Sequence, residues 1–282
     1  MRELTDKVAV ITGGAGALGV ALAKRFAREG MKLVLADVDN NALERVAAGL
    51  KASGASVMTQ RTDVSKGTDV EALARTTVAA FGAVHLVINN AGVATVGSVW
   101  ESTEADWQWT LSVNLWGVIH GVRVFAPIMM RQGTEGHIVN VASVAGLISP
   151  AGMGVYNVSK HAVVALTETL HHDLAAERAR IKCSVLCPAY FPSGIADSER
   201  TRPTMLANDD VPRSATRQEM EATLRKAVHS GRIGADRIAD RVCEAVQAEH
   251  FYILTHERIK PAIAARMQDI LDEAPPRDPM RL

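Results

Sequence analysis

Three side chains in the middle of the sequence have the types and spacing for proton transfer to or from an oxygen atom. Tyr156 and Lys160 are four residues apart in a helical pattern, so they lie on one face of the predicted helix 155–178. Ser143 ends an apolar run that predicts a strand, at the edge where open α/β sheets bind ligands. A phenol made more acidic by a nearby ammonium group can act as a general base or acid. Because a Tyr and a Lys at this spacing often occur by chance, the elements that position them decide what the pair means.

Those elements follow a regular order, in which short β-branched runs alternate with longer helical patterns. Strands are predicted over residues 7–12, 32–37, 56–63, 85–92, 136–143, 181–188 and 251–256. Helices are predicted over residues 18–30, 41–52, 68–81, 104–131, 155–178, 235–249 and 261–271. Apolar strands joined by helices indicate a parallel sheet covered on both faces. We therefore expect one α/β domain over residues 1–282, with a Rossmann-like, doubly wound parallel sheet in three α/β/α layers.

Two segments fall outside this alternation. Residues 189–232 contain several prolines, scattered charges and little clear period. A segment of that length within a compact domain is typical of disorder or of a functional lid. We expect a substrate lid at about 189–232 and a C-terminal extension at about 257–282, whose last residues are frayed.

A glycine-rich segment, TGGAGALG at residues 12–19, lies between the first predicted strand and the first predicted helix. Glycines let the backbone approach a pyrophosphate closely, and the helix N-terminus offers free N–H groups and the positive end of its dipole. The predicted cofactor contacts in this segment are Gly13, Ala15, Gly16, Ala17, Leu18 and Gly19.

Asp37 ends the second predicted strand, where its carboxylate can accept hydrogen bonds from both hydroxyls of an adenosine ribose and would repel a 2′-phosphate. Val38 follows it and the glycine loop carries no basic residue, which favours NAD over NADP. Asp37 would be a helix cap in the alternative interpretation, but Asp39 and Asn40 can do that capping.

With these features in place, the sequence resembles the short-chain dehydrogenase/reductase family over about residues 7–193. The glycine loop matches at Thr12, Gly13 and Gly19, while Ala17 replaces the middle glycine of the usual pattern. The family's catalytic tetrad is matched by Asn114, Ser143, Tyr156 and Lys160. The resemblance implies further cofactor contacts from Asp63, Val64, Asn90, Ala91, Gly92, Tyr156, Lys160, Pro188 and Ser193.

The resemblance implies hydride transfer between NAD and a secondary alcohol or ketone, with Tyr156 as acid and base and no metal. A free tyrosine has a pKa of about 10, which is too high for a base near neutral pH. Lys160 beneath the ring and a positively charged nicotinamide are expected to lower it by about 3 units, which corresponds to about 4 kcal/mol. Ser143 would hydrogen-bond the substrate oxygen. By resemblance, Lys160 also holds the nicotinamide ribose, and Asn114 positions a water that links Lys160 to solvent.

The substrate side of the site is expected to be apolar. Residues 144–154, VAGLISPAGMG, would lie along the substrate in this family, and Tyr190 and Phe191 open the expected lid. The predicted substrate pocket consists of Ser143, Ala145, Met153, Tyr156, Tyr190 and Phe191. This composition favours an apolar or cyclic alcohol or ketone.

The charge balance and the composition limit the classes of partner and the compartment that we expect for this protein. Lys plus Arg and Asp plus Glu both number 31, so neither nucleic acid nor an anionic membrane is expected. No apolar stretch approaches the ~20 residues of a membrane span and the N-terminus lacks a signal-peptide core, which predicts a cytoplasmic protein. Cys183, Cys187 and Cys243 are expected to be buried free thiols. The family resemblance implies a homo-oligomer, with a tetramer favoured and a dimer as the alternative.

Three other interpretations remain open. The chain could be an NADP-dependent ketone reductase, or a non-catalytic dinucleotide-binding protein on the same fold. The full set of Asn, Ser, Tyr and Lys argues against a pure binding role. Sugar epimerases and dehydratases also use a Tyr and Lys at this spacing, but they usually have a tighter glycine pattern and a larger C-terminal substrate region.

Overall fold

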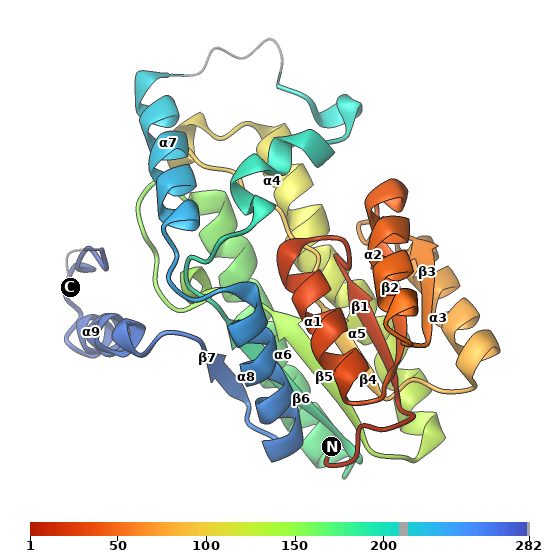
Figure 1. Ribbon diagram of the computed structural model, residues 1–282. Coiled ribbons are helices and arrows are strands. Elements are labelled where there is room, and N and C mark those ends of the chain that lie inside the picture. The colour runs from red at the N-terminus through yellow and green to blue at the C-terminus, as the bar shows by residue number, and fades with distance from the viewer. Residues whose placement is uncertain (209–213, 281–282) are drawn as a thin grey trace.

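The computed structural model describes residues 1–208 and 214–280. Within that part of the chain, seven parallel strands form one sheet in the order β3-β2-β1-β4-β5-β6-β7 (Figure 1). The strands are β1 (Val8–Thr12), β2 (Lys32–Asp37), β3 (Val57–Arg61), β4 (Leu86–Asn89), β5 (Gly136–Val141), β6 (Ile181–Cys187) and β7 (Tyr252–Leu254). The strand order reverses between β1 and β4, and a crevice at that point binds the ligand in doubly wound sheets.

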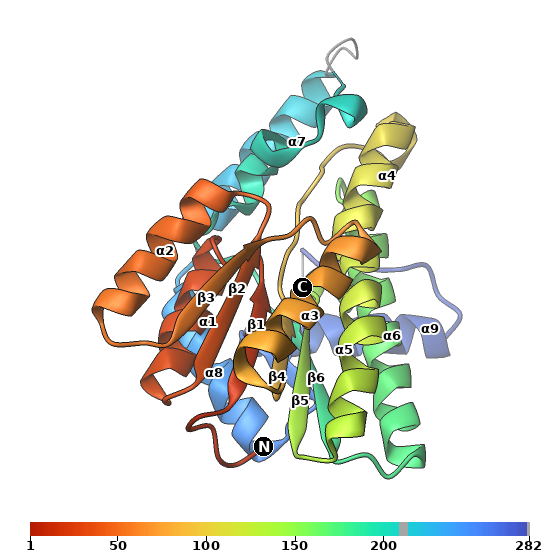
Figure 2. The ribbon, with the colours of Figure 1, turned by 90° about the vertical axis from the view of Figure 1, so that its right-hand side faces the viewer.

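Helices cover both faces of the sheet, which confirms the predicted three-layer, single-domain fold (Figure 2). One layer contains α1 (Ala17–Arg28), α2 (Asn40–Ala52) and α8 (Ala235–Ala248). The other layer contains α3 (Gly67–Phe81), α5 (Gly117–Gln132) and α6 (Gly154–Ala176). Outside these layers lie α4 (Glu104–Leu111), α7 (Ala215–His229) and α9 (Lys260–Leu271). Short helical turns are η1 (Val99–Glu101), η2 (Ser112–Trp116), η3 (Val144–Gly146), η4 (Gly194–Thr201), η5 (Thr204–Leu206) and η6 (Glu257–Ile259).

Strand β1 shows why the strands are apolar along their whole length. Successive side chains of a strand point to opposite faces. Ile11 packs in the core beneath α1 with Phe26, whereas Val10 packs in the core beneath α5 with Phe125. Both faces are therefore buried, and alternation between polar and apolar residues is absent from this strand.

The predicted helix 104–131 exists as one helical stretch, Glu104–Gln132, but it is not a regular α-helix. Its middle part, η2, is a π-helix that contains Asn114. A π-helical turn closes i→i+5 hydrogen bonds and often occurs at functional sites. The extra residue in this turn changes which side chains of the stretch face the sheet.

The same stretch corrects the expectation that no segment is long and apolar enough to span a membrane. By length and composition alone, Glu104–Gln132 passes that test. However, Phe125 and Met129 are at most 1% exposed because they pack against the sheet. These contacts are typical of a core helix.

The segment expected to be a lid contains regular structure that the sequence did not predict. Turns η4 and η5 and the 15-residue helix α7 lie beyond the carboxyl ends of the strands (Figure 1). Part of the expected lid, residues 209–213, lies outside the described residues, as do residues 281–282 of the expected C-terminal extension. In the extension, α9 projects from the body of the molecule, and Arg277 folds back on it to pair with Asp269.

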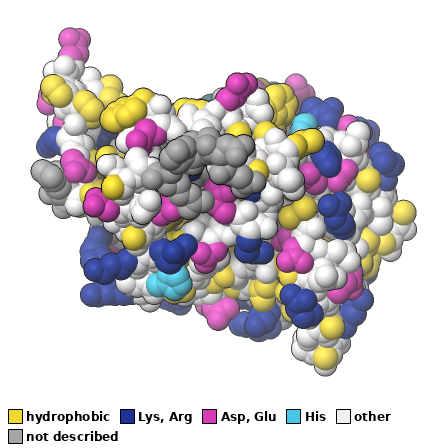
Figure 3. Space-filling view, turned by 90° about the horizontal axis from the view of Figure 1, so that it is seen from above, with side chains coloured by type: hydrophobic (Ala, Val, Ile, Leu, Met, Phe, Trp, Pro, Cys, Tyr) yellow, Lys and Arg dark blue, Asp and Glu magenta, His cyan; other side chains and the backbone are white. Residues whose placement is uncertain are grey.

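Two smaller expectations about side chains can be compared with the structure. Cys183, Cys187 and Cys243 are buried free thiols, as predicted. Basic and acidic side chains both occur across the face seen from above, with apolar atoms between them (Figure 3).

Candidate active site

A large cavity lies at the carboxyl edge of the sheet and has a volume of about 1160 Å³. Ordinary small-molecule sites occupy roughly 300–1,000 Å³. The predicted site residues that line it are Gly13, Ala15, Gly16, Ala17, Leu18, Asp37, Asp63, Val64, Asn90, Ala91, Gly92, Ser143, Ala145, Met153, Tyr156, Lys160, Pro188, Tyr190, Phe191 and Ser193. Gly19 and Asn114 do not line it, and they act from behind its wall. The structure therefore brings nearly the whole predicted set together around one space.

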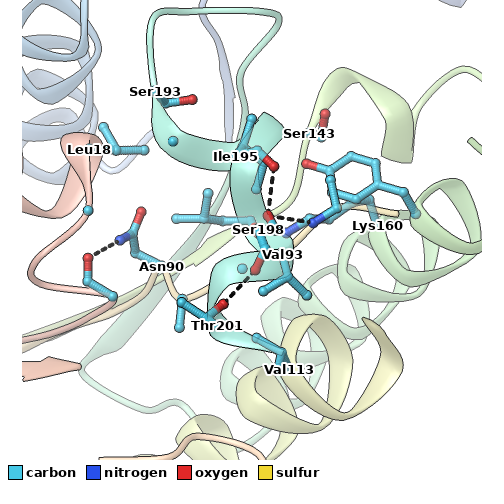
Figure 4. Close-up of a pocket in the computed structure, with 18 of the residues that line it drawn as sticks. Leu18, Asn90, Val93, Val113, Ser143, Lys160, Ser193, Ile195, Ser198 and Thr201 are labelled. Atoms are coloured by element: carbon cyan, nitrogen blue, oxygen red, sulfur yellow. Dashed lines mark hydrogen bonds between the residues drawn. The ribbon is translucent and has the colours of Figure 1, made fainter. Parts of the chain in front are cut away.

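The two halves of the site face each other across this cavity. In Figure 4, Leu18 and Asn90 lie on one side and Ser143 and Lys160 on the other, and η4 crosses between them. Residues of η4 and α7 therefore roof the cavity, and the sheet edge forms its floor.

The glycine loop has the conformation that close approach to a phosphate requires. Gly13 has a φ of +62°, in the left-handed region that favours glycine. A Cβ on Gly19 would lie 2.1 Å from the Gly13 carbonyl oxygen, so only glycine allows α1 to begin this close to the loop. Ala17 is the first residue of α1 and lines the cavity.

Asp37 faces the cavity and is held by the backbone around it. Its Oδ2 accepts the Ala15 N–H at 3.0 Å, and its Oδ1 accepts the Asp39 N–H at 3.0 Å. Asp39, not Asp37, caps α2 by accepting the Ala42 N–H. This confirms that Asp39 does the capping, while the expected role of Asp37 at the ribose stays a prediction. Each Asp37 oxygen keeps acceptor capacity for a ligand hydroxyl.

The loop after β4 is fixed to the glycine loop. The Thr12 hydroxyl accepts the N–H groups of Asn90 and Ala91 at 2.9 and 3.2 Å. The Asn90 side chain donates in turn to the carbonyl oxygens of Thr12 and Gly13. The two loops that line the middle of the cavity therefore form one rigid unit.

Asp63 and Val64 lie at the far end, next to the ends of β2 and β3. The Asp63 carboxylate accepts hydrogen bonds from the Ser65 N–H and hydroxyl, at 3.1 and 2.6 Å. The Val64 side chain is buried against Gly117, where a Cβ would lie 2.8 Å from Val64 Cγ2. Both residues are thereby fixed as a wall of the cavity.

Ser143, Tyr156 and Lys160 converge at the opposite end. The Ser143 hydroxyl donates to the Pro188 carbonyl oxygen at 3.3 Å and accepts the Ala145 N–H at 3.1 Å. Lys160 Nζ lies 5.6 Å from the centroid of the Tyr156 ring and donates to the Val141 carbonyl oxygen at 2.9 Å. The predicted sharing of one helix face by Tyr156 and Lys160 is confirmed.

The lowered Tyr156 pKa expected beside a bound nicotinamide stays a prediction, and in the chain on its own the pKa shifts in the other direction. Burial raises the pKa of Tyr156 to about 12, although the hydrogen bond with Ser143 opposes this. The same cause lowers the pKa of Lys160 to about 8. Desolvation is the largest cause of the Tyr156 shift, and the Lys160 ammonium group donates to the Val141 carbonyl oxygen.

Asn114 lies in the π-helical turn with its side chain fully buried. Its Oδ1 accepts the Val93 N–H at 2.8 Å, and its Nδ2 donates to the Val93 carbonyl oxygen and the Ser159 hydroxyl. The side chain thus ties the segment after β4 to α6. Its expected role in positioning a water stays a prediction.

Sequence reasoning missed much of the substrate side of the cavity. The further lining residues include Val93, Trp109, Val113, Ile148, Ile195, Ser198, Leu224 and Val228. Leu224 and Val228 of α7 pack in one apolar cluster with Met153, Tyr156 and Tyr190. Their four-residue spacing was the one signal in the sequence, and the charged residues around them obscured it.

The cavity fits a dinucleotide on evidence internal to the structure. The Ser193 hydroxyl oxygen is buried, and within the described residues it has no hydrogen-bond partner. Buried polar groups are normally paired, so Ser193 indicates a ligand group beside it. The glycine loop, Asp37 and Lys160 would hold the phosphates, the adenosine ribose and the nicotinamide ribose.

Comparisons with known proteins agree with this geometry. Residues 7–204 match the family model for short chain dehydrogenases. A CLA biosynthesis dehydrogenase/reductase from Lactiplantibacillus plantarum is 34% identical over 277 residues, 98% of this chain and 97% of that protein. A 1-deoxy-11-beta-hydroxypentalenate dehydrogenase from Streptomyces exfoliatus is 32% identical over 270 residues, 95% of this chain and 90% of that protein. A short chain dehydrogenase/reductase from Burkholderia phymatum, solved in complex with NAD, is 51% identical with a TM-score of 0.97 and 99% coverage of both chains.

The chain therefore belongs to the short-chain dehydrogenase/reductase family of oxidoreductases.

Proposed function

We propose that this protein is an NAD-dependent oxidoreductase that interconverts a secondary alcohol and the matching ketone, with an apolar or cyclic substrate. One observation carries the proposal: Ser143, Tyr156 and Lys160 converge in the same cavity as the glycine loop and Asp37. A protein that only binds a dinucleotide would not need that proton-transferring group. The catalytic residues are Ser143, Tyr156 and Lys160, and Asn114 positions the segment beside them.

Support for NAD over NADP comes from Asp37, whose carboxylate faces the cavity where an adenosine ribose would lie. Nearby basic side chains are partly neutralised, because Lys66 pairs with Asp63 at 3.4 Å and Arg200 with Asp39 at 3.9 Å. The Burkholderia phymatum protein, with 51% identity, was solved in complex with NAD. We therefore assign NAD as the cofactor.

When bound, the nicotinamide exchanges a hydride with the substrate carbon, and in its oxidised form it adds a positive charge. Tyr156 supplies or removes the proton at the substrate oxygen. With a pKa of about 12 in the chain alone, the phenol is protonated at neutral pH, which suits proton donation during ketone reduction. Alcohol oxidation requires that pKa to fall, so a positive charge beside the phenol has to favour the phenolate. Ser143 stabilises the developing charge on the substrate oxygen.

The lining of the substrate side favours an apolar substrate. Ile148, Met153, Ile195, Leu224 and Val228 line the cavity close to the residues that cluster with Tyr156. One relative is named for a hydroxypentalenate and another for CLA biosynthesis. We propose a hydroxyl or keto group on a largely hydrocarbon skeleton.

We also propose a homo-oligomer, with a tetramer favoured over a dimer. Trp116 on η2 and Val158 on α6 are each about half exposed, and we propose that the two long helical stretches that carry them pair between subunits. Light scattering coupled to gel filtration measures the subunit number directly.

The decisive experiment compares Tyr156→Phe with the wild type. A panel of secondary alcohols with NAD, and of ketones with NADH, is followed by NADH absorbance, while cofactor binding is measured by calorimetry. We expect turnover to fall by about 10³-fold or more while the NAD dissociation constant changes less than about threefold, because the variant loses only the transferable proton. Equal turnover in the two proteins would remove the basis of the proposal.

A further inference from the structure

A buried ion cluster joins α4 to the segment that roofs the cavity. Asp106 is 1% exposed and lies in the first turn of α4. Its Oδ1 accepts hydrogen bonds from Arg202 Nη1 and from Asn208 Nδ2, both at 2.8 Å. Its Oδ2 accepts from Arg217 Nη1 at 3.2 Å. Arg202 follows η4, Asn208 lies between η5 and α7, and Arg217 lies in the first turn of α7. All three bind the Asp106 carboxylate, although they are 96 to 111 residues from it along the chain.

The carboxylate is charged and its partners are as buried as it is. The side chains of Arg202 and Arg217 are 4% and 9% exposed. Burial alone raises the pKa of Asp106, but the two guanidinium groups outweigh it and hold that pKa below its ordinary range. Two buried positive charges therefore depend on one buried negative charge. Glu199 and Glu221 also pair with the two arginines, at 3.1 and 3.5 Å, and their side chains are 47% and 28% exposed.

The cluster touches the wall of the substrate cavity. Trp109, one helical turn after Asp106, lines the cavity and is 1% exposed. The Arg202 guanidinium lies over its ring, with 4.9 Å between Cζ and the centroid. A second tether lies nearby, where the Ala94 N–H donates to the Ser198 hydroxyl at 3.1 Å (Figure 4). The cavity roof is thus bound to the rest of the molecule at several points, and Asp106 provides its most buried charged contact.

We propose that Asp106 is a positioning residue that holds η4, η5 and α7 closed over the substrate end of the cavity. The expected effect on substrate KM rests on the proposed function, whereas the expected closure of η4, η5 and α7 does not. Leu224 and Val228 reach the cavity only while α7 stays docked, and Arg217 docks the first turn of α7 on Asp106. The dinucleotide end is built from the glycine loop, Asp37 and the loop after β4, which contact Asp106 nowhere in the described hydrogen bonds. Asp106 therefore acts mainly on substrate binding, and it reaches the dinucleotide end only indirectly, through η4, which follows Ser193 and carries Arg200.

The test uses Asp106→Asn, which keeps the shape and removes the charge. The two guanidinium groups then lose their buried carboxylate and, within the described residues, keep only the more exposed Glu199 and Glu221 as ionised acceptors. Loss of one partner of a buried ion pair favours the open arrangement. We expect hydrogen exchange within 194–206 and 215–229 to accelerate by about tenfold or more while the strands keep their protection. We also expect the KM for an apolar alcohol to rise by about tenfold or more, with a clearly smaller change in the NAD dissociation constant.

Asp197→Asn is the matched control. Asp197 lies in the same segment and pairs with Arg225 of α7 at 3.1 Å, but both side chains are more than half exposed. Exposed ion pairs contribute little, so exchange and KM are expected to stay within about twofold of the wild type. Arg217→Gln is a milder variant that leaves the Asp106–Arg202 pair intact, and we expect it to accelerate exchange in 215–229 but not in 194–201.

Two results would overturn the inference. One is unchanged exchange in 194–206 and 215–229 of Asp106→Asn. The other is acceleration spread evenly over the whole chain, which would make Asp106 a general stability residue. Hydrogen exchange needs no turnover, so these results stand apart from any failure to find a substrate.

Discussion

Replacing Lys160 by methionine is expected to stabilise the fold while it removes activity. Lys160 is 3% exposed, and burial lowers the pKa of its ammonium group from 10.5 to about 8. At about 1.4 kcal/mol per pKa unit, that change corresponds to a cost of about 3 kcal/mol for keeping the protonated side chain in the folded protein at neutral pH. Lys160→Met also deprives the Val141 carbonyl oxygen of a donor at 2.9 Å, which costs about 1 kcal/mol. The free energy of unfolding should therefore rise by about 2 kcal/mol at pH 7.

The sign of the pH dependence follows from the direction of the pKa. Since the folded pKa lies below the unfolded one, the cost is fully present below about pH 8 and disappears as the pH rises toward 10.5. The advantage of Lys160→Met over the wild type should thus shrink by about 1.4 kcal/mol per pH unit above pH 8, and approach zero near pH 9.5. Other titrating groups are common to both proteins and cancel in this difference.

The assay is urea unfolding of both proteins at pH 7 and pH 9.5, without dinucleotide, because a ligand would stabilise the folded state. Lys24→Met, at an exposed position of α1, is the control for removing a positive charge, and is expected to change stability by less than about 0.5 kcal/mol. A Lys160→Met protein that is less stable than the wild type by the same amount at both pH values would refute the reasoning.

Two further predictions test the cofactor end and the core. Asp37→Ser should raise the KM for NAD by about tenfold or more and reduce the preference for NAD over NADP, because it removes the carboxylate that faces the adenosine ribose. An unchanged ratio of the kcat/KM values for the two cofactors would contradict this. Gly121→Ala should lower the free energy of unfolding by about 1–3 kcal/mol or more, since its Cβ would lie 2.0 Å from the buried Asn89 Oδ1. Gly49→Ala, in α2 with nothing within 4 Å, is its control and should stabilise by up to ~1 kcal/mol in the same urea titration.

The sheet and the catalytic constellation were predictable because their signals are local. Apolar runs of strand length, each followed by a helical pattern, determine the order of elements, and residues at strand ends such as Asp37 and Ser143 then fall at one edge. The four-residue spacing of Tyr156 and Lys160 needed only a helix to place both side chains on one face. These inferences required no knowledge of contacts between distant segments.

What the sequence did not reveal depends on distant contacts. Asp106, Arg202 and Arg217 are separated by up to 111 residues, and each alone resembles any other charged residue. Helix α7 was missed because only Leu224, Val228 and Arg217 of its described side chains are buried, which leaves little apolar period. The π-helical turn around Asn114 was missed because one inserted residue hardly disturbs a helical pattern.

The raised pKa of Tyr156 in the chain on its own was not foreseen for the same reason, because desolvation depends on what covers a group. Burial raises the pKa of Tyr156 and lowers that of Lys160, so one cause disfavours the charged form of both. Tyr190, whose pKa burial also raises, packs in the same cluster, and so do Leu224 and Val228 of the roof. The high pKa of Tyr156 is therefore a property of the closed site and not of the Tyr–Lys pair. We therefore expect the phenol to stay neutral in the closed, empty site and to ionise only when a ligand brings a positive charge beside it.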